Sequence, residues 1–474
     1  MPLVIVFIGI LFLLFLMIKL KISPFLGLIF TCLFVGVLIG LDFLQIIDAI
    51  GVGFGNTLGK IALILVFGAM LGKLIESSGA AQVITDELVK KFGLPKIQYA
   101  ILITGFLVGL PMMYNASFLV MIPLIYALSL RTKLPLMYLG IPLSATLSIA
   151  HAFLPPHPAP TYVSVIFGAD LNMVLLYGLG PVIPACFLAG ILFSKLFKHY
   201  TNLPPVNLFT PTVIDEKDLP GLTESILVAI SPVIFMLSGT LLDFILGPLP
   251  EKSVMISEGF LNPKAYYQYL LLDRGVSEYL AVVGGVTLSF LKFLSDANMA
   301  LMLAVLLGLW LLGIKKGRSM EDLMHQLGMA VSAIAMILLI IGAGGAFSEI
   351  LKAGKVNEFI AQVSNGMQFN PLIIAFSIAA ILRFAVGSAT VATMTAAPIV
   401  LPMAIQYQVP PELMVLATGS GSLMFSHFND VGFWMFKEYF NLNIKQTFMI
   451  WSVMETIIAL VGLGFCLIVY YFFF

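Results

Sequence analysis

Residues 65–79, LVFGAMLGKLIESSG, recur with one insertion as residues 339–354, LIIGAGGAFSEILKAG. An internal repeat is also indicated by four pairs of residues at nearly the same offset of roughly 275 positions: Pro135 with Pro411, Ser144 with Ser420, Thr146 with Ser422, and His151 with His427. Apolar sequence aligns easily by chance, so the proline and polar matches are the stronger argument. We therefore predict that the chain consists of two related halves.

The composition excludes a soluble globular protein. Hydrophobic residues make up 60% of the 474 residues and charged residues only 10%, whereas soluble domains are about 25% charged. Lysine plus arginine equals aspartate plus glutamate at 24 each, so no basic surface for nucleic acid is predicted. The three cysteines lie in separate apolar runs, which is typical of packing residues. We predict an all-α polytopic membrane protein with no metal and no cofactor.

Apolar stretches long enough to enter a bilayer recur along the whole chain. They fall at 2–18, 25–41, 61–75, 97–112, 114–130, 136–153, 170–195, 224–247, 298–314, 329–351, 371–386, 388–406, 411–428 and 446–472. Some are short enough to be re-entrant hairpins, so we predict 12–14 membrane segments. The predicted division is an N-terminal extra helix (1–22), repeat one (23–198), a cytoplasmic linker (199–222), a connecting helix with an external or interfacial segment (223–297), and repeat two (298–474).

Basic residues cluster at every second loop, as the positive-inside rule requires. The predicted inner loops contain Lys19, Lys21, Lys90, Lys91, Lys96, Arg131, Lys133, Lys195, Lys198, Lys315, Lys316, Arg318, Lys437 and Lys445. Both termini are then outside, and residues 2–18 form a retained helix, since no basic segment precedes them and no cleavage site follows. The span at 25–41 starts inside and its counterpart at 298–314 starts outside. Such inverted repeats place a substrate site between broken helices at the bilayer midplane.

Two matching stretches contain helix breakers beside polar residues. Residues 109–117, GLPMMYNAS, include Asn115, and residues 387–395, GSATVATMT, include Ser388 and Thr390. A serine or threonine that caps a half-helix leaves free N–H groups, which favour an anion. The alternative is that these small residues only allow neighbouring helices to pack closely.

Histidines at matching positions mark a second pair of breaks. His151 is followed by PPHPAPT, whose prolines unwind the chain near His157, and His427 lies in SHFNDVGFW beside Asn429 and Asp430. Polar and ionisable residues inside a bilayer are costly and point to function. Arg383, one turn before the second break, either binds a substrate carboxylate or forms an ion pair with an acid such as Asp430.

Enzyme signatures are missing from the sequence. It contains no HExxH, no GxSxG and no GxxxxGK[ST] motif, so ATP-driven transport by this chain alone is not expected. We therefore predict that the protein is not an enzyme.

At these residues the chain resembles the gluconate permease family of bacterial proton symporters. The resemblance covers nearly the whole chain and is most specific at FGAMLGKLIESSGAAQVI, FLPPHPAPT, GSATVATMTA and SGSLMFSHFNDVGFWMFKEYF. It implies a place in the ion-transporter superfamily, an elevator-type mechanism, a homodimer and the bacterial cytoplasmic (inner) membrane. Two positions depart from the family pattern: Asn115 stands where an acid is expected, and Ala159 where glycine is expected.

The leading hypothesis is a proton-coupled importer of gluconate or a related sugar acid. D-serine or another small hydroxy-carboxylate is the alternative substrate, and an intramembrane enzyme or a passive channel is the competing class. Substrate binding is assigned to Asn115, Ser144, Thr146, His151, His157, Ser388, Thr390, Ser420, Ser422, His427 and Asn429. Proton coupling or charge pairing is assigned to Asp430, His151, His427 and Arg383.

Overall fold

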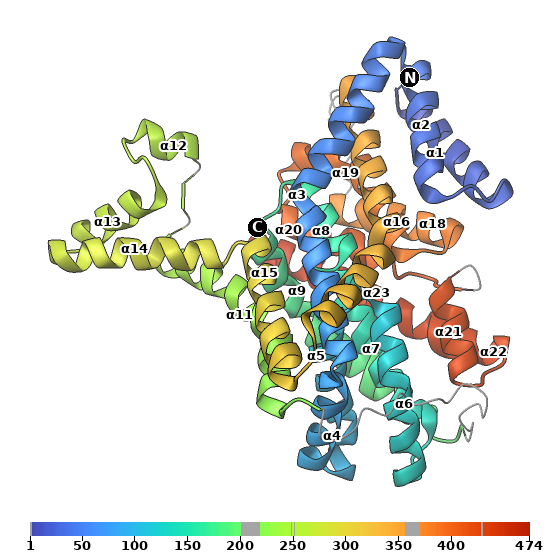
Figure 1. Cartoon of the computed structure of the whole chain (residues 1–474). Helices are drawn as coiled ribbons and strands as arrows, with labels where there is room; N and C mark the ends of the chain where they lie inside the picture. The colour runs from blue at the N-terminus through green and yellow to red at the C-terminus, as the bar shows by residue number, and fades with distance from the viewer. Residues whose placement is uncertain (1, 201–218, 248, 251, 356–369, 428–429) are drawn as a thin grey trace.

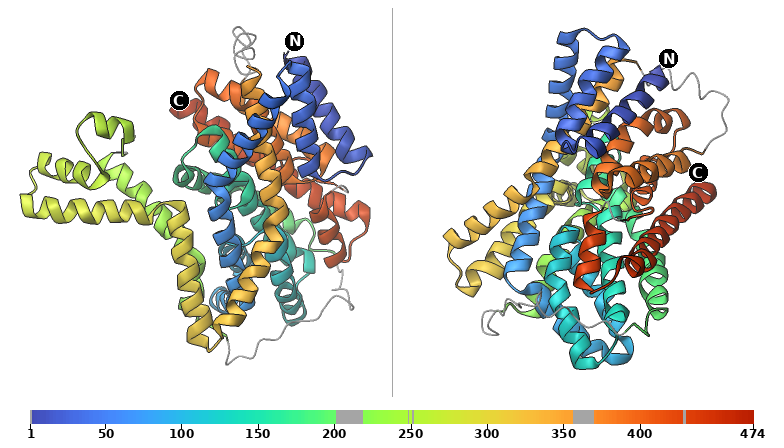
Figure 2. Two further views of the ribbon diagram at one scale, coloured as in Figure 1. Left: turned by 45° about the horizontal axis from the view of Figure 1, so that its top comes forward. Right: turned by 90° about the vertical axis from the view of Figure 1, so that its right-hand side faces the viewer.

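The computed structural model describes residues 2–200, 219–247, 249–250, 252–355, 370–427 and 430–474, and these residues form helices and no strand. Most helices gather in one elongated body, with α1 and α2 at one end and α4 at the other (Figure 1). Helices α12 to α14 project from this body as an arm, which the left view of Figure 2 shows from a second direction.

The first half of the chain contains α1 (Pro2–Leu14), α2 (Pro24–Ile39), α3 (Phe43–Ser77), α4 (Ala80–Phe92), α5 (Ile97–Gly109), α6 (Tyr114–Thr132), α7 (Leu136–Phe153), α8 (Pro158–Phe167), α9 (Leu171–Ala185) and α10 (Phe193–Lys195). The second half contains α11 (Leu222–Leu246), α12 (Lys252–Ser257), α13 (Pro263–Asp273), α14 (Glu278–Leu294), α15 (Ala297–Gly308), α16 (Met320–Ala353), α18 (Pro371–Val386), α19 (Ala389–Tyr407), α20 (Pro411–Gly421), α21 (Val431–Tyr439), α22 (Ile444–Thr447) and α23 (Val453–Phe473). Single π-helical turns continue α1, α9, α15 and α22.

Within the described residues, nine helices are long and apolar enough to cross a membrane. The pair α4 and α5, bent by 114°, makes a tenth span if it is counted as one. Three further apolar helices, which include the predicted stretches 2–18 and 25–41, are shorter than a full span. The predicted 12–14 segments therefore correspond to about nine full spans together with shorter pieces.

Two of the predicted spans are much longer than the sequence suggested. The stretch predicted at 61–75 belongs to α3, which begins at Phe43. Asn56 and Lys60 interrupt the apolar pattern there without ending the helix. The true start is fixed by a capping box, in which Asp42 accepts a hydrogen bond from Leu44 N at 3.0 Å and donates its own N–H to Gln45 at 3.1 Å. The stretch predicted at 329–351 is likewise part of the longer α16.

The two long helices α3 and α16 run side by side through the body (Figure 1). Glycines make their close approach possible, because a Cβ on Gly53 would lie 2.4 Å from the carbonyl oxygen of Gly345. A Cβ on Gly342 would lie 2.4 Å from the ring of Phe54. Small residues at a crossing let two backbones come near enough to gain van der Waals contact inside a membrane. The glycines of the second copy of the repeated stretch, residues 339–354, thus pack against residues 53–57 of α3, outside the first copy.

The arm joins the body through α11 and α15. Its two longer helices, α13 and α14, pack closely, since a Cβ on Gly285 would lie 2.9 Å from the carbonyl oxygen of Lys264. Lys292 and Asp243 form an ion pair at 2.5 Å at the base of the arm. Helix α14 (Glu278–Leu294) lies within the predicted external or interfacial segment. The predicted linker 199–222 lies mostly outside the described residues.

We expect Gly345→Ala to lower stability, whereas Gly328→Ala in the same helix should not. The added methyl at 345 would lie 2.0 Å from Thr57 Oγ1 and 2.6 Å from the Gly53 carbonyl oxygen. Overpacking of this kind costs about 1–3 kcal/mol. No atom lies within 4 Å of a Cβ at Gly328, so alanine there should gain up to about 1 kcal/mol of helix propensity. The thermal unfolding midpoints of both purified variants in detergent test this, and equal midpoints would contradict the tight crossing.

Candidate functional site

Both predicted helix breaks between spans are present. Helix α5 ends at Gly109 and α6 begins at Tyr114, with Pro111 in the intervening segment. In the second half, Gly387 has a φ of +81° and ends α18. Ser388 then caps α19, because its Oγ accepts a hydrogen bond from Val391 N at 3.3 Å. Of the two residues that the sequence offered as a cap, Ser388 and Thr390, Ser388 caps α19.

One cavity of about 590 Å³ lies between these breaks. The first turns of α6 and α19 both line it, and residues of α7, α16, α18, α21 and α23 form further parts of its wall. Helix N-termini carry partial positive charge and unpaired N–H groups, so two of them beside one cavity favour an anion there. The polar residues that line it are Tyr114, Asn115, Ser148, His151, Arg383, Ser388, Thr390, Asp430, Trp451 and Glu455.

An ion pair lies in the cavity wall. Arg383 Nη2 donates to Asp430 Oδ2 at 2.5 Å, and the side chains are 2% and 14% exposed. Ser426 joins them, since its Oγ accepts from Arg383 at 2.7 Å and donates to Asp430 at 2.6 Å. Asp430 also accepts from Gly432 N at 2.9 Å and so caps α21. Of the two roles that the sequence left open for Arg383, the structure contains the ion pair.

The arginine retains donors that these contacts do not use. Arg383 Nη1 donates to the carbonyl oxygen of Gly387 at the break. Its Nε atom is buried and has no acceptor among the described residues. A buried donor without a partner is costly, and an anionic ligand in the cavity is a suitable acceptor for it.

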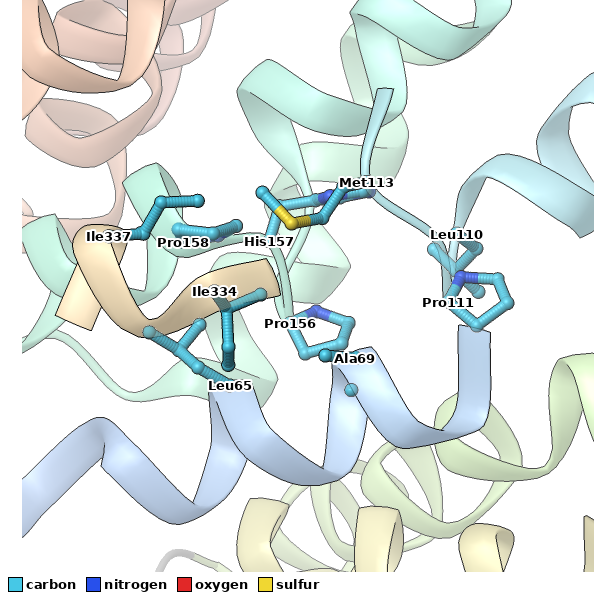
Figure 3. A pocket seen from close by; sticks show the side chains of 11 residues that line it. Leu65, Ala69, Leu110, Pro111, Met113, Pro156, His157, Pro158, Ile334 and Ile337 are labelled. Carbon is cyan, nitrogen blue, oxygen red and sulfur yellow. The ribbon is translucent and has the colours of Figure 1, made fainter. Parts of the chain in front are cut away.

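His151 connects the two halves of the chain. Its Nε2 lies 3.3 Å from Thr390 Oγ1 on α19, and its Nδ1 lies 3.3 Å from Nδ1 of His157. His157 itself is buried and faces a second, smaller cavity. Figure 3 shows Pro156, His157 and Pro158 around that cavity with Met113, and Leu65 on the other side.

Six of the predicted site residues line the larger cavity: Asn115, His151, Arg383, Ser388, Thr390 and Asp430. Other predicted hydroxyls are buried and bond to their own helices instead: Thr146 to Pro142 O at 2.9 Å, Ser420 to Leu416 O at 2.7 Å and Ser422 to Gly419 O at 2.7 Å. Ser144 is fully buried in α7. His427 Nε2 lies 3.1 Å from Phe384 O. Asn429 lies outside the described residues.

Four polar cavity residues were missed by the sequence analysis: Tyr114, Ser148, Trp451 and Glu455. Glu455 in α23 is only 1% exposed and accepts a hydrogen bond from Ser148 Oγ at 2.5 Å. Trp451 Nε1 donates to Ser426 Oγ at 2.7 Å. A signal for Glu455 was present, because it is the one charged residue in the apolar stretch 446–472. Within the described residues, no group of three or more His, Cys, Asp or Glu is placed to hold a metal ion.

Comparisons with known proteins agree along the whole chain. The sequence model of the family described as "GntP family permease" matches residues 1–261 and 268–472. The high-affinity gluconate transporter of Escherichia coli K12 is 41% identical over 99% of both chains. The L-idonate transporter of the Gnt-II system from the same organism is 40% identical over 98% of both. The gluconate permease of Bacillus subtilis 168 is 39% identical over 99% of both.

Solved structures with a similar fold are transporters of low sequence identity. The YdaH transporter of Alcanivorax borkumensis superposes with a TM-score of 0.63 at 14% identity, over 94% of this chain and 98% of that one. MtrF of Neisseria gonorrhoeae superposes with a TM-score of 0.59 at 14% identity, over 90% and 84%. At this identity the similarity concerns the fold alone.

We expect Asp430→Asn to destabilise the protein by about 3 kcal/mol, because it leaves the buried Arg383 without its counter-charge. Asn115→Ala is the matched control, since Asn115 is exposed on the cavity wall and should change stability by no more than about 0.5 kcal/mol. Thermal unfolding of both purified variants without substrate is the measurement. Equal stability of the two variants would show that the ion pair contributes nothing.

Proposed function

Because this chain belongs to the GntP family of permeases, we propose that it is a secondary active importer of gluconate or a related sugar acid, driven by protons. The chain is a transporter and not an enzyme, and sugar-acid import agrees with its relatives. The single observation that supports this function best is the cavity where two helix N-termini meet beside Arg383. L-idonate is the first alternative substrate, since one relative is named for it.

The cavity suits a small hydroxylated anion. Its volume of about 590 Å³ falls within the usual range for small-molecule sites. We assign the substrate carboxylate to the N-termini of α6 and α19 and to the unused donors of Arg383. Asn115, Ser388 and Thr390 supply the hydrogen-bonding groups that hydroxyls require, and His151 orients Thr390. D-serine offers fewer hydroxyls to this set, so the sugar acid is the better match.

The negative charge of the substrate supports proton coupling, because import must move that charge against the membrane potential. An anion that enters a negative-inside cell works against the membrane potential, at about 2.3 kcal/mol per 100 mV for each charge. Import of the anion with one proton moves no net charge. A gradient-driven importer of a sugar acid therefore gains most from a proton-binding group beside the anion site.

We further infer that residues 23–198 and 298–474 are inverted repeats of an elevator-type transporter. Corresponding pairs of elements support this: α5 and α6 match α18 and α19 in having a break between two helices, and α7 and α8 match α20 and α21. The long helices α3 and α16 also occupy matching places. In this proposal the paired breaks travel with the substrate across the membrane.

The alternation of loops that contain lysine and arginine with loops that do not supports a bacterial inner-membrane orientation with both termini outside.

We also infer a homodimer in which the arm contacts a second copy. The arm and its base expose large apolar side chains, among them Phe244 (87%), Leu261 (84%) and Tyr279 (78%). Apolar surface on this scale marks a contact with lipid or protein.

An inward proton gradient should drive gluconate accumulation in proteoliposomes above the external concentration, because each entering anion takes a proton down its gradient. A protonophore should abolish the accumulation but leave exchange of internal for external gluconate. Competition by unlabelled L-idonate and D-serine then ranks the substrates. If gluconate uptake is the same with and without the proton gradient and the protonophore, proton coupling is contradicted, and transport is passive.

Removal of the Thr390 hydroxyl should weaken gluconate binding. Thr390→Val keeps the shape but removes a hydroxyl beside the anion site, and one lost hydrogen bond of about 1.4 kcal/mol is a tenfold loss. We expect KM for uptake to rise about tenfold on this basis. The matched control Ser420→Ala removes a hydroxyl that bonds only within α20 and should leave KM near the wild-type value. Equal KM values for both variants would show that the Thr390 hydroxyl does not bind the substrate.

A further inference from the structure

We propose that Glu455 is the group that carries the transported proton and that Ser148 positions its carboxyl. This inference rests on the proposed proton-coupled import. Glu455 lies in the wall of the anion cavity, and Ser148 Oγ donates to its Oε1 at 2.5 Å from α7. The two residues lie on different halves of the chain, so the bond between them joins α7 to α23.

The location of Glu455 is unusual for a residue with only a structural role. It is the single charged residue of α23 and is 1% exposed. Acids inside a membrane protein are rare, face the interior and commonly mark proton pathways. Among the described residues, Glu455 forms no ion pair with a Lys, Arg or His side chain within 4 Å. Its hydrogen-bond partner is the neutral Ser148, and a serine hydroxyl can donate to either the ionised or the protonated carboxyl.

The other charges of the cavity already balance. Arg383 and Asp430 pair at 2.5 Å, and Asp430 accepts from Ser426 Oγ and Gly432 N as well. The Asp430 carboxylate therefore already accepts from three donors. An ionised Glu455 then adds one uncompensated negative charge to the cavity, and a substrate carboxylate is repelled by it. Protonation of Glu455 removes that charge, so anion binding and proton binding favour each other.

The other titratable groups in the cavity, and those on or beside the helices that contact α23, are less suited to this role. Tyr114 and His151 line the same cavity from α6 and α7. The two facing nitrogens of His151 and His157 are 3.3 Å apart, so they share one proton between them. Asp170, Tyr177 and Glu412, on or beside α9 and α20, interact with one another. Cys186 contacts Thr146.

Asn115 and Glu455 line the same cavity from different helices. The Asn115 amide on α6 does not ionise, whereas the Glu455 carboxyl on α23 can bind and release a proton. In the transport step, Glu455 Oε2 binds a proton from the outer solution as the anion binds. The O–H bond breaks again when the anion leaves on the inner side, and the proton passes to the inner solution.

Proton uptake on substrate binding tests the assignment. Gluconate is added to purified protein in lightly buffered detergent at mildly alkaline pH, and a pH-sensitive dye reports protons taken from solution. We expect the wild type to take up a proton with gluconate and Glu455→Gln to take up none. Glu455→Gln should also bind gluconate with an affinity that no longer falls as pH rises, because its amide resembles the protonated acid.

Two controls make each outcome decisive. Glu412→Gln, which removes another partly buried acid away from the cavity, should take up protons as the wild type does. Glu455→Asp keeps a carboxyl and should retain proton uptake, so a folding defect in the glutamine variant can be recognised. If Glu455→Gln takes up as many protons as the wild type, the assignment to Glu455 is wrong, but the proposed proton coupling still stands. A wild type that binds gluconate without proton uptake and ignores a proton gradient would overturn the proposed coupling itself.

Discussion

The rest of the structure depends on two interruptions of helical hydrogen bonding inside the apolar body, at residues 110–113 and 387–388. Lipid offers no partner for a free N–H or C=O group, so a broken helix must face protein or a polar cavity. The chain meets this requirement by turning both breaks toward one space and covering that space with α7, α16 and α23. The free N–H groups of the two breaks then make this space attractive to an anion. In the proposed function, the structural requirement and the binding site therefore have the same origin.

Rigid packing surrounds the breaks. The glycines at the contact between α3 and α16 let the two longest helices approach closely, with the Phe54 ring packed against Gly342. The Thr146 hydroxyl on α7 and the Ser420 hydroxyl on α20 bond within their own helices. Buried glycines on α20 lie against backbone atoms, as at Gly419 with the carbonyl oxygen of Ala152. Tight packing of this kind keeps α7 and α20 at fixed distances from the cavity. His151 and Ser148, both on α7, thereby hold constant positions opposite α19 and α23.

In the proposed function, charge balance gives the cavity its selectivity. A single arginine beside two helix N-termini favours negative ligands, but Asp430 offsets part of that positive charge. The buried carboxyl of Glu455 then decides whether the cavity is neutral or negative. A site of this kind holds an anion well only when the acid is neutral, since repulsion between two carboxylates is strong in a poorly solvated space. The same residues can thus define both what binds and when it binds.

The sequence by itself determined the class, the membrane location, the family and the positions of both helix breaks. Composition, glycine, proline and a capping serine act locally, so these features can be read without knowing which helices are neighbours. Only the tertiary structure decided which polar residues share a cavity. Ser420 and Ser422 looked equivalent to Thr390 in sequence, yet they bond within α20, while Glu455, some 65 positions from Thr390 along the chain, lines the cavity with it. The rotation of each helix about its axis selects the side chains that face the cavity, and packing between distant helices sets that rotation.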